Sequence, residues 1–225
     1  MVGNLDQMLQ AYASQKAEMD RQGIYFVRDI NDDEAEKFSK SLYVMGSERS
    51  GYPGRDIDVY INSGGGSVGA GFAMIEMMFK IKRDFKVRIN TIVTGYAYSM
   101  GAILFQAGDW RKMGFFSTLM LHSGFWQISG EDQKVFKDYE KLSVMYQNFI
   151  GDLFAKRTKR HDLKWWRNYI YSGRDRFLSA REALDLGLVD EVCDFDSCYV
   201  NPSKPPMEAT DDKKTKIAKP NQTPK

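Results

Sequence analysis

The chain has 225 residues, 43% of them hydrophobic, which suits one folded domain with appendages better than two domains. Its 32 basic and 30 acidic residues leave a formal charge of only +2, so no strong overall field would draw the chain to nucleic acid or a membrane surface. Binding partners must therefore be inferred from local patterns.

The first 23 residues are polar and predict an N-terminal arm, either a short helix or a segment without regular structure. They lack the basic stretch followed by an apolar run that marks a secretory signal. Regular structure is expected to begin with a strand at Ile24–Val27. A helix should follow, with Asn31 and Glu34 as its capping signature and Gly46 as its end.

The middle of the chain alternates between strand and helix patterns. Strands are expected at residues 57–62, 87–94 and 117–121, and helices at 68–81 and 180–186. This order predicts a layered α/β fold in which helices cover a parallel sheet. The stretch from Ile89 to Gly108 carries no charge and has about the length that spans a bilayer, but its polar residues favour a buried strand, turn and helix.

A long amphipathic helix is predicted from Glu131 to Arg157. Its apolar residues recur at spacings of four and three, namely at Val135, Tyr139, Leu142, Tyr146, Phe149 and Leu153. Such a helix extends about 40 Å, further than one small core requires. We therefore expect part of its apolar stripe to contact another subunit, with packing inside the chain as the alternative.

The end of the chain combines two cysteines with a polar tail. Cys193 and Cys198 form neither a CxxC motif nor a spacing typical of zinc, so we expect no disulfide framework, no metal site and a reducing, cytoplasmic environment. Residues 196–225 contain few apolar side chains, and we expect a disordered tail there.

A glycine-rich loop links the second expected strand to its helix. Gly64, Gly66 and Gly69 match the GxGxxG pattern, and Asp84 lies twenty residues beyond Gly64, as in dinucleotide-binding folds. Asp84 precedes the next expected strand instead of ending it, which disfavours nucleotide binding. The remaining alternatives are an ordinary tight turn and an oxyanion site with the Gly66 amide as donor.

Ser99 follows a buried strand and precedes an apolar helix. Ala97 and Gly101 leave room on both sides, as in a nucleophile elbow, although the strict signature has glycine at the first position. A helix N-cap is the alternative. Of the two possible bases, His122 ends a strand, whereas His161 lies in a charged stretch that suits a surface or capping role. His122 is the better candidate, with a structural core histidine as its alternative.

Together these residues resemble the ClpP family of self-compartmentalising serine peptidases. The similar segments are Tyr60–Val68, Ser99–Ala102, Met120–His122 and the run from Arg174 to Asp190. The resemblance implies Ser99 as nucleophile, His122 as general base and Asp175 as the acid that orients the base. It also implies an oxyanion hole built from the Gly66 and Met100 amides.

The resemblance further implies a ClpP/crotonase-like domain over residues 24–195, with the long helix as a protruding handle. Family members hydrolyse unfolded polypeptides inside two stacked heptameric rings. ATP would be used only by a hexameric AAA+ unfoldase partner, because this chain has no phosphate loop, and no cofactor or metal is expected in the chain itself. The chain departs from the family pattern at Gly64, at Ser123–Gly124 and at Gly173.

Three other functions are compatible with the same fold. A crotonase-like acyl-CoA hydratase or isomerase would use carboxylates instead of a serine elbow. A capsid-maturation peptidase would apply the same chemistry to one scaffold substrate. An inactive ring subunit would only shape an assembly.

Overall fold

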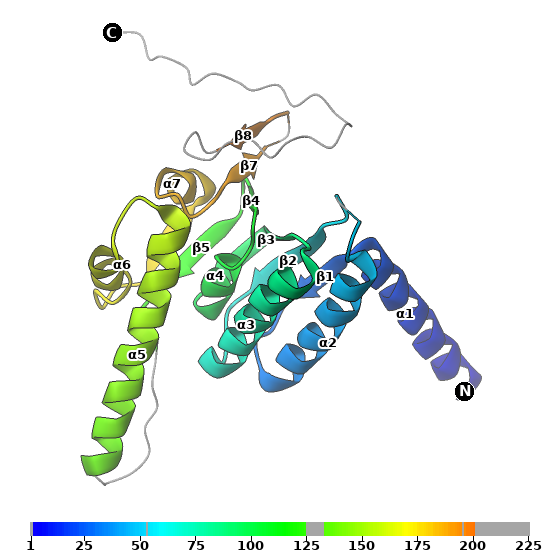
Figure 1. Ribbon diagram of the computed structural model, residues 1–225, viewed down its shortest axis with the longest axis horizontal. Helices are drawn as coiled ribbons and strands as arrows, with labels where there is room; N and C mark the ends of the chain where they lie inside the picture. Colours follow the sequence, from blue (N-terminus) through cyan, green and yellow to red (C-terminus); the bar gives the residue numbers. More distant parts are fainter. Residues whose placement is uncertain (1, 53, 125–132, 195, 201–225) are drawn as a thin grey trace.

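The computed structural model describes residues 2–52, 54–124, 133–194 and 196–200. Its strands form one mainly parallel eight-stranded sheet in the order β1-β2-β3-β4-β7-β8, with β5 paired to β3 and β6 paired to β5 (Figure 1). Only the β5–β6 and β7–β8 pairs are antiparallel. The strands are β1 (Ile24–Val27), β2 (Ile57–Ser63), β3 (Ile89–Tyr98), β4 (Arg111–Gly114), β5 (Thr118–Leu121), β6 (Arg176–Ser179), β7 (Glu191–Cys193) and β8 (Cys198–Val200).

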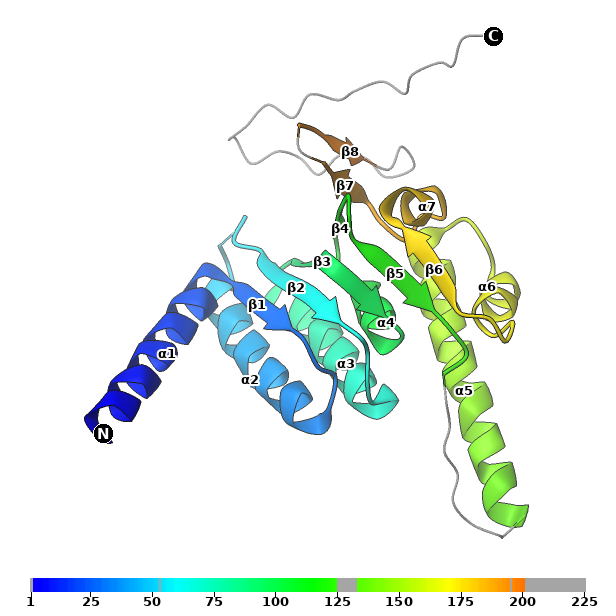
Figure 2. The same ribbon diagram turned by 180° about the vertical axis from the view of Figure 1, so that it is seen from behind.

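Helices cover one face of this sheet. In Figure 1, α2, α3 and α4 lie in front of the strands, and the opposite view in Figure 2 shows β1, β2, β3, β5 and β6 with no described helix in front of them. The predicted α/β fold with a mainly parallel sheet is confirmed. The helices are α1 (Val2–Gln22), α2 (Asp32–Arg49), α3 (Val68–Phe85), α4 (Met100–Phe105), α5 (Gln133–Thr158), α6 (Leu163–Ile170) and α7 (Ala180–Asp185).

The main core lies between the sheet and the helices on its covered face. β2 alternates strictly between buried and half-buried residues, so Ile57, Val59 and Ile61 are fully buried. On α3, Met74 and Met78 are equally buried, because the helix presents one apolar stripe to the sheet. Each such side chain contributes about 1.5–3 kcal/mol relative to exposure.

Strand β3 pairs with two different strands on the side away from β2. Residues 91–93 pair with β4, whereas residues 96–98 pair with β5. Gly95 lies between the two paired stretches at φ +95°, and an added Cβ there would meet the Asn62 side chain at 2.9 Å. This change of pairing partner forms a fork in the sheet, with β4 and β5 as its two branches. The fork brings the C-terminal ends of β3 and β5 side by side.

Most of the predicted elements are present, but several predicted ends are wrong: the helix expected at 68–81 continues to Phe85, and the strand expected at 87–94 covers residues 89–98. The Asn31 side chain accepts a hydrogen bond from the Glu34 amide at the start of α2, as predicted. Helix α2 does not end at Gly46 but continues to Arg49. A Cβ on Gly46 would lie 2.7 Å from Ile81, so this glycine permits close packing against α3 and does not terminate the helix.

Two helices project from the sheet. The N-terminal arm is a 21-residue helix, α1, whose outer half exposes Leu5, Met8, Leu9 and Tyr12 (Figure 1). The predicted long helix is α5, and it carries exposed Tyr139 and Phe149. None of the helices in the described ranges is both long and apolar enough to cross a membrane.

The expectation that Cys193 and Cys198 form no disulfide is wrong, because the two residues are joined by one. They are register partners across the β7–β8 hairpin, which places their side chains on the same side of neighbouring strands. The two cysteines therefore no longer support the expectation of a reducing environment. The hairpin also places residues 198–200 in the sheet, whereas the rest of the predicted tail, 201–225, lies outside the described residues.

A buried ion pair connects β4 to the segment before β7. The side chains of Arg111 and Asp190 are 2% and 1% exposed, and the guanidinium donates from Nε at 3.0 Å and from Nη2 at 2.7 Å to the two carboxylate oxygens. The Arg111 backbone amide also donates to Asp190. Removing one partner would leave the other charge buried without compensation.

Asp190→Ala is therefore expected to lower the free energy of unfolding by about 3–5 kcal/mol. Urea denaturation of both proteins at the same protein concentration measures this difference. The matched control is Lys156→Ala, which breaks an exposed ion pair to Asp152 and should change stability by less than about 1 kcal/mol. Equal losses in the two variants would contradict the prediction.

Candidate active site

Strand pairing brings together the three side chains predicted to act as nucleophile, base and acid. Tyr98 at the end of β3 is the register partner of Met120 on β5, so Ser99 and His122 follow directly from neighbouring strand ends. Leu121 pairs with Arg176 in the antiparallel β5–β6 ladder, which sets Asp175 beside His122. The site therefore lies at the carboxyl edge of the parallel strands, where open α/β sheets bind ligands.

Ser99 occupies a sharp turn between β3 and α4. Its backbone adopts φ 54° and ψ −123°, a combination that is rare for residues other than glycine and carries a cost of about 1–3 kcal/mol. The turn is held by a 2.9 Å hydrogen bond from the Ser99 amide to the Met120 carbonyl. Ser99 is the N-cap residue of α4, but its side chain makes no capping hydrogen bond, so helix capping does not account for the hydroxyl.

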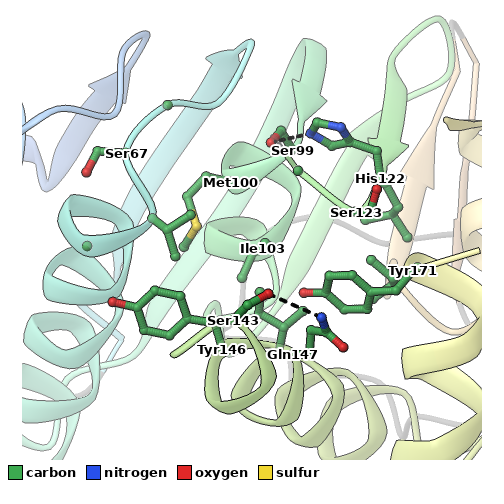
Figure 3. A pocket seen from close by; sticks show the side chains of 17 residues that line it. Ser67, Ser99, Met100, Ile103, His122, Ser123, Ser143, Tyr146, Gln147 and Tyr171 are labelled. Atoms are coloured by element: carbon green, nitrogen blue, oxygen red, sulfur yellow. Dashed lines mark hydrogen bonds between the residues drawn. The ribbon is translucent and has the colours of Figure 1, made fainter. Parts of the chain in front are cut away.

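The hydroxyl of Ser99 is instead hydrogen-bonded to His122. The Oγ to Nε2 distance is 2.7 Å, within the range of a good hydrogen bond (Figure 3). On the other side of the ring, His122 Nδ1 lies 3.8 Å from Asp175 Oδ1, which is an ion-pair distance but too long for a hydrogen bond. The His122 side chain is 11% exposed and that of Asp175 is 56% exposed.

The glycine loop after β2 lies against the Ser99 turn. An added Cβ on Gly65 would meet Ser99 Cβ at 2.8 Å, and one on Gly66 would meet the Ile30 carbonyl oxygen at 2.1 Å. Both residues have positive φ, at +102° and +146°. Only glycine fits at these two positions, because the backbone approaches its neighbours so closely.

Two backbone amides belong to residues that line the cavity at Ser99. The Met100 amide belongs to the first turn of α4, whose N–H groups have no acceptor within the helix. Gly66 and Met100 both line the same cavity as Ser99 and His122. This arrangement can accept a group with a developing negative charge next to a hydroxyl and an imidazole.

A cavity of about 470 Å³ opens from these residues toward α5 and α6. Much of its wall is apolar, and Figure 3 shows Ile103 between the Ser99 turn and the side chains of α5. The lining residues outside the glycine loop and the Ser99 turn are Ile103, Leu121, His122, Ser123, Gly124, Ser143, Tyr146, Gln147, Ile150, Ile170 and Tyr171. The cavity is large enough for an extended side chain.

The loop that carries Asp175 is tied to α6 by Arg176. The Arg176 guanidinium lies over the Tyr169 ring, 4.2 Å from its centroid, and its Nε donates to the Tyr169 carbonyl at 2.6 Å. Its Nη2 also donates to the Ser172 hydroxyl at 3.2 Å. Arg176 therefore fixes both ends of the short segment from 172 to 176, and Asp175 lies within that segment.

Other residues considered in the sequence lie outside this site. His161 stacks on Trp165 with ring centroids 3.6 Å apart, so it is engaged at the start of α6. Asp84 pairs with Lys80 at the end of α3. In the described ranges, one group with metal-ligand atoms close together contains Glu191, Cys193 and Cys198. Its two sulfurs are joined in the disulfide and offer no thiolate.

Comparisons with known proteins agree with this geometry. The family model for Clp protease matches residues 6–196 of the chain. The chain belongs to the Clp protease family. A curated relative, the ATP-dependent Clp protease proteolytic subunit of Oltmannsiellopsis viridis, is 32% identical over 172 residues, which cover 75% of this chain and 82% of the relative.

Membership in the Clp protease family supports a peptidase and disfavours the crotonase-like alternative. The sequence did not indicate the polar part of the cavity wall, which includes Ser143, Gln147 and Tyr171. The spacing of Ser143, Gln147 and Ile150 on one face of α5 could have suggested a shared surface. The contact between Arg176 and α6 had no local signal, because it depends on how two separate elements pack.

The fit between the glycine loop and the Ser99 turn is testable with two adjacent substitutions. Gly65→Ala should lower the free energy of unfolding by about 1–3 kcal/mol, since the new methyl group clashes with the Ser99 turn. Gly64→Ala should change it by less than about 0.5 kcal/mol, because no atom lies within 4 Å of that added Cβ. Urea denaturation compares the two variants, and equal stability would show that the loop does not press on the turn.

Proposed function

We propose that this chain is a serine endopeptidase subunit that cleaves unfolded polypeptides through an acyl-enzyme on Ser99. The observation that carries the proposal is the 2.7 Å hydrogen bond between Ser99 Oγ and His122 Nε2 at a strained turn beside two candidate amide donors. A hydroxyl is a weak nucleophile without a base, and an imidazole is the usual base near neutral pH.

The chemistry follows from the positions of these groups. His122 Nε2 accepts the Ser99 proton as Oγ attacks the peptide carbonyl, and the Gly66 and Met100 amides donate to the resulting oxyanion. The imidazolium then protonates the leaving amine, and water hydrolyses the ester with His122 again as base. No cofactor or metal takes part in these steps.

Asp175 would complete the triad by orienting the His122 ring and stabilising the imidazolium. Its present distance of 3.8 Å from Nδ1 requires an approach of roughly 1 Å to form a hydrogen bond. The exposed Asp175 side chain has room for this rotation. Catalytic hydrogen bonds are often longer without substrate and shorten in the reacting complex.

We propose that identical subunits form heptameric rings that enclose the active sites. Two such rings would stack, as the resemblance to the ClpP family implies. Exposed apolar residues on α5, including Phe136, Met145 and Phe149, support a subunit contact along this helix. A hexameric AAA+ unfoldase would supply unfolded polypeptide and use the ATP. We propose that the peptidase acts in the cytoplasm.

The role of Ser99 is tested by labelling the chain with an alkyl fluorophosphonate probe. The wild-type chain should be labelled at Ser99, and Ser99→Ala should lose the label and peptidase activity by at least about 10³-fold. Ser47→Ala serves as the control and should keep the label, since its exposed hydroxyl lies on α2, outside the cavity, and donates to the Val44 carbonyl. Labelling that persists in Ser99→Ala would remove the assignment.

The proposed role of Asp175 predicts a coupling to Arg176. Asp175→Asn should lower kcat by about 10²–10⁴-fold, and Arg176→Ala by about tenfold, because the loop loses its anchor. Substrate KM should change little in either variant. Combined with Asp175→Asn, the Arg176 substitution should have almost no further effect on kcat.

The control for this pair is Arg181→Ala on α7, which removes an exposed positive charge without changing the Asp175 loop. It should leave kcat within about twofold of wild type. If the Asp175 and Arg176 effects multiply independently, then Arg176 does not act through Asp175.

A further inference from the structure

The cavity beside Ser99 contains a polar cluster on the part of its wall formed by α5 and the end of α6. Ser143 and Gln147 come from α5, and Tyr171 follows α6. Figure 3 shows these three side chains close together, with Ile103 between them and the Ser99 turn. A side chain that enters past Ile103 therefore meets polar groups after an apolar stretch.

Hydrogen bonding fixes which atoms of this cluster act as donors. Arg167 Nη2 lies 3.3 Å from Gln147 Oε1, and a guanidinium can only donate, so the amide oxygen of Gln147 must face Arg167. The amide nitrogen then faces Ser143 and donates to its Oγ at 3.3 Å. Ser143 is an acceptor in this bond and retains its own hydrogen, which no acceptor in the described part of the chain receives.

The electrostatic surroundings reinforce this donor character. No carboxylate in the described ranges lies within ion-pair distance of Arg167, so its positive charge is not neutralised by a salt bridge there. Burial raises the pKa of Tyr171 to about 12, and the nearby charge of Arg167 opposes this rise only in part. The Tyr171 hydroxyl is therefore protonated at neutral pH and available as a donor.

We infer that this donor-rich cluster selects substrates whose side chain at the attacked residue ends in a hydrogen-bond acceptor. Glutamine should be preferred over norleucine, which has a similar length but no acceptor. The apolar stretch at Ile103 would contact the methylene groups, and the Ser143 hydroxyl would donate to the terminal oxygen. The inference rests on the proposed function, because it requires Ser99 to attack the residue whose side chain occupies the cavity.

Two tripeptide diphenyl phosphonates test the inference with the full 225-residue chain. They share one capped sequence and differ only in glutamine or norleucine at the phosphonate-bearing residue. Attack by Ser99 Oγ forms an O–P bond and releases phenol, with His122 taking the serine proton. We expect the glutamine probe to react about tenfold faster in kinact/KI, the ratio expected for one well-placed hydrogen bond.

Variants separate the polar cluster from general effects on the site. Ser143→Ala and Gln147→Leu should each bring the ratio of the two rates close to one. Asn148→Leu is the matched control, since this amide lies next to Gln147 on α5 but does not line the cavity, and it should keep the wild-type ratio. A wild-type ratio of one or less, or a ratio that survives both cluster substitutions, would overturn the inference.

Labelling by the small alkyl fluorophosphonate separates failure of this inference from failure of the proposed function. If that probe labels Ser99 while the glutamine phosphonate shows no advantage, or neither phosphonate reacts, the side-chain selection is wrong and the nucleophile assignment stands. If Ser99 is not labelled at all, the proposed function is wrong and the inference is overturned with it.

Discussion

The site depends on the register in which β5 is held between β3 and β6. Tyr98 pairs with Met120, and Leu121 pairs with Arg176, so the residues after β3, after β5 and before β6 share one edge of the sheet. Side chains alternate between the two faces of a strand, so a slip of one residue in β5 would move the His122 side chain to the opposite face. The fork in β3 provides this register, because β5 can pair only where β4 has left β3.

The strained turn at Ser99 is held by its surroundings. The sheet fixes its amide through Met120, and the glycine loop approaches from the side of β2. A Cβ added at Gly101, in the first turn of α4, would lie 3.1 Å from the Ser63 carbonyl oxygen. Helix α4 therefore also packs directly against the end of β2. The cost of the Ser99 conformation, about 1–3 kcal/mol, is small compared with the burial of the core residues around it. The turn can thus persist in the folded chain although its local conformation is unfavourable.

Much of the fold could be predicted from the sequence, because periodic apolar patterns and capping residues act locally. The Asn31 cap and the strands of the sheet are examples. Ser99 and His122 were indicated by their positions after expected strands, whereas Asp175 was implied only by the resemblance to the ClpP family. The errors came from contacts that exist only in the folded chain, either between distant segments or across a hairpin. Gly46 has the local signature of a helix end, yet its role is set by Ile81 on a neighbouring helix. Likewise, Cys193 and Cys198 become partners only when a hairpin forms between them.

The cavity wall shows why such contacts also decide function. On α5, Ser143, Gln147 and Ile150 face the cavity, whereas Met145 and Phe149 are exposed on other sides of the same helix. Arg167 on α6 orients the Gln147 amide, and Arg176 ties α6 to the loop that holds Asp175. A displacement of α6 relative to the sheet would therefore alter the polar cluster and the Asp175 loop together. Because α5 packs against α6, any subunit that covers the exposed side of α5 would restrain both features at once.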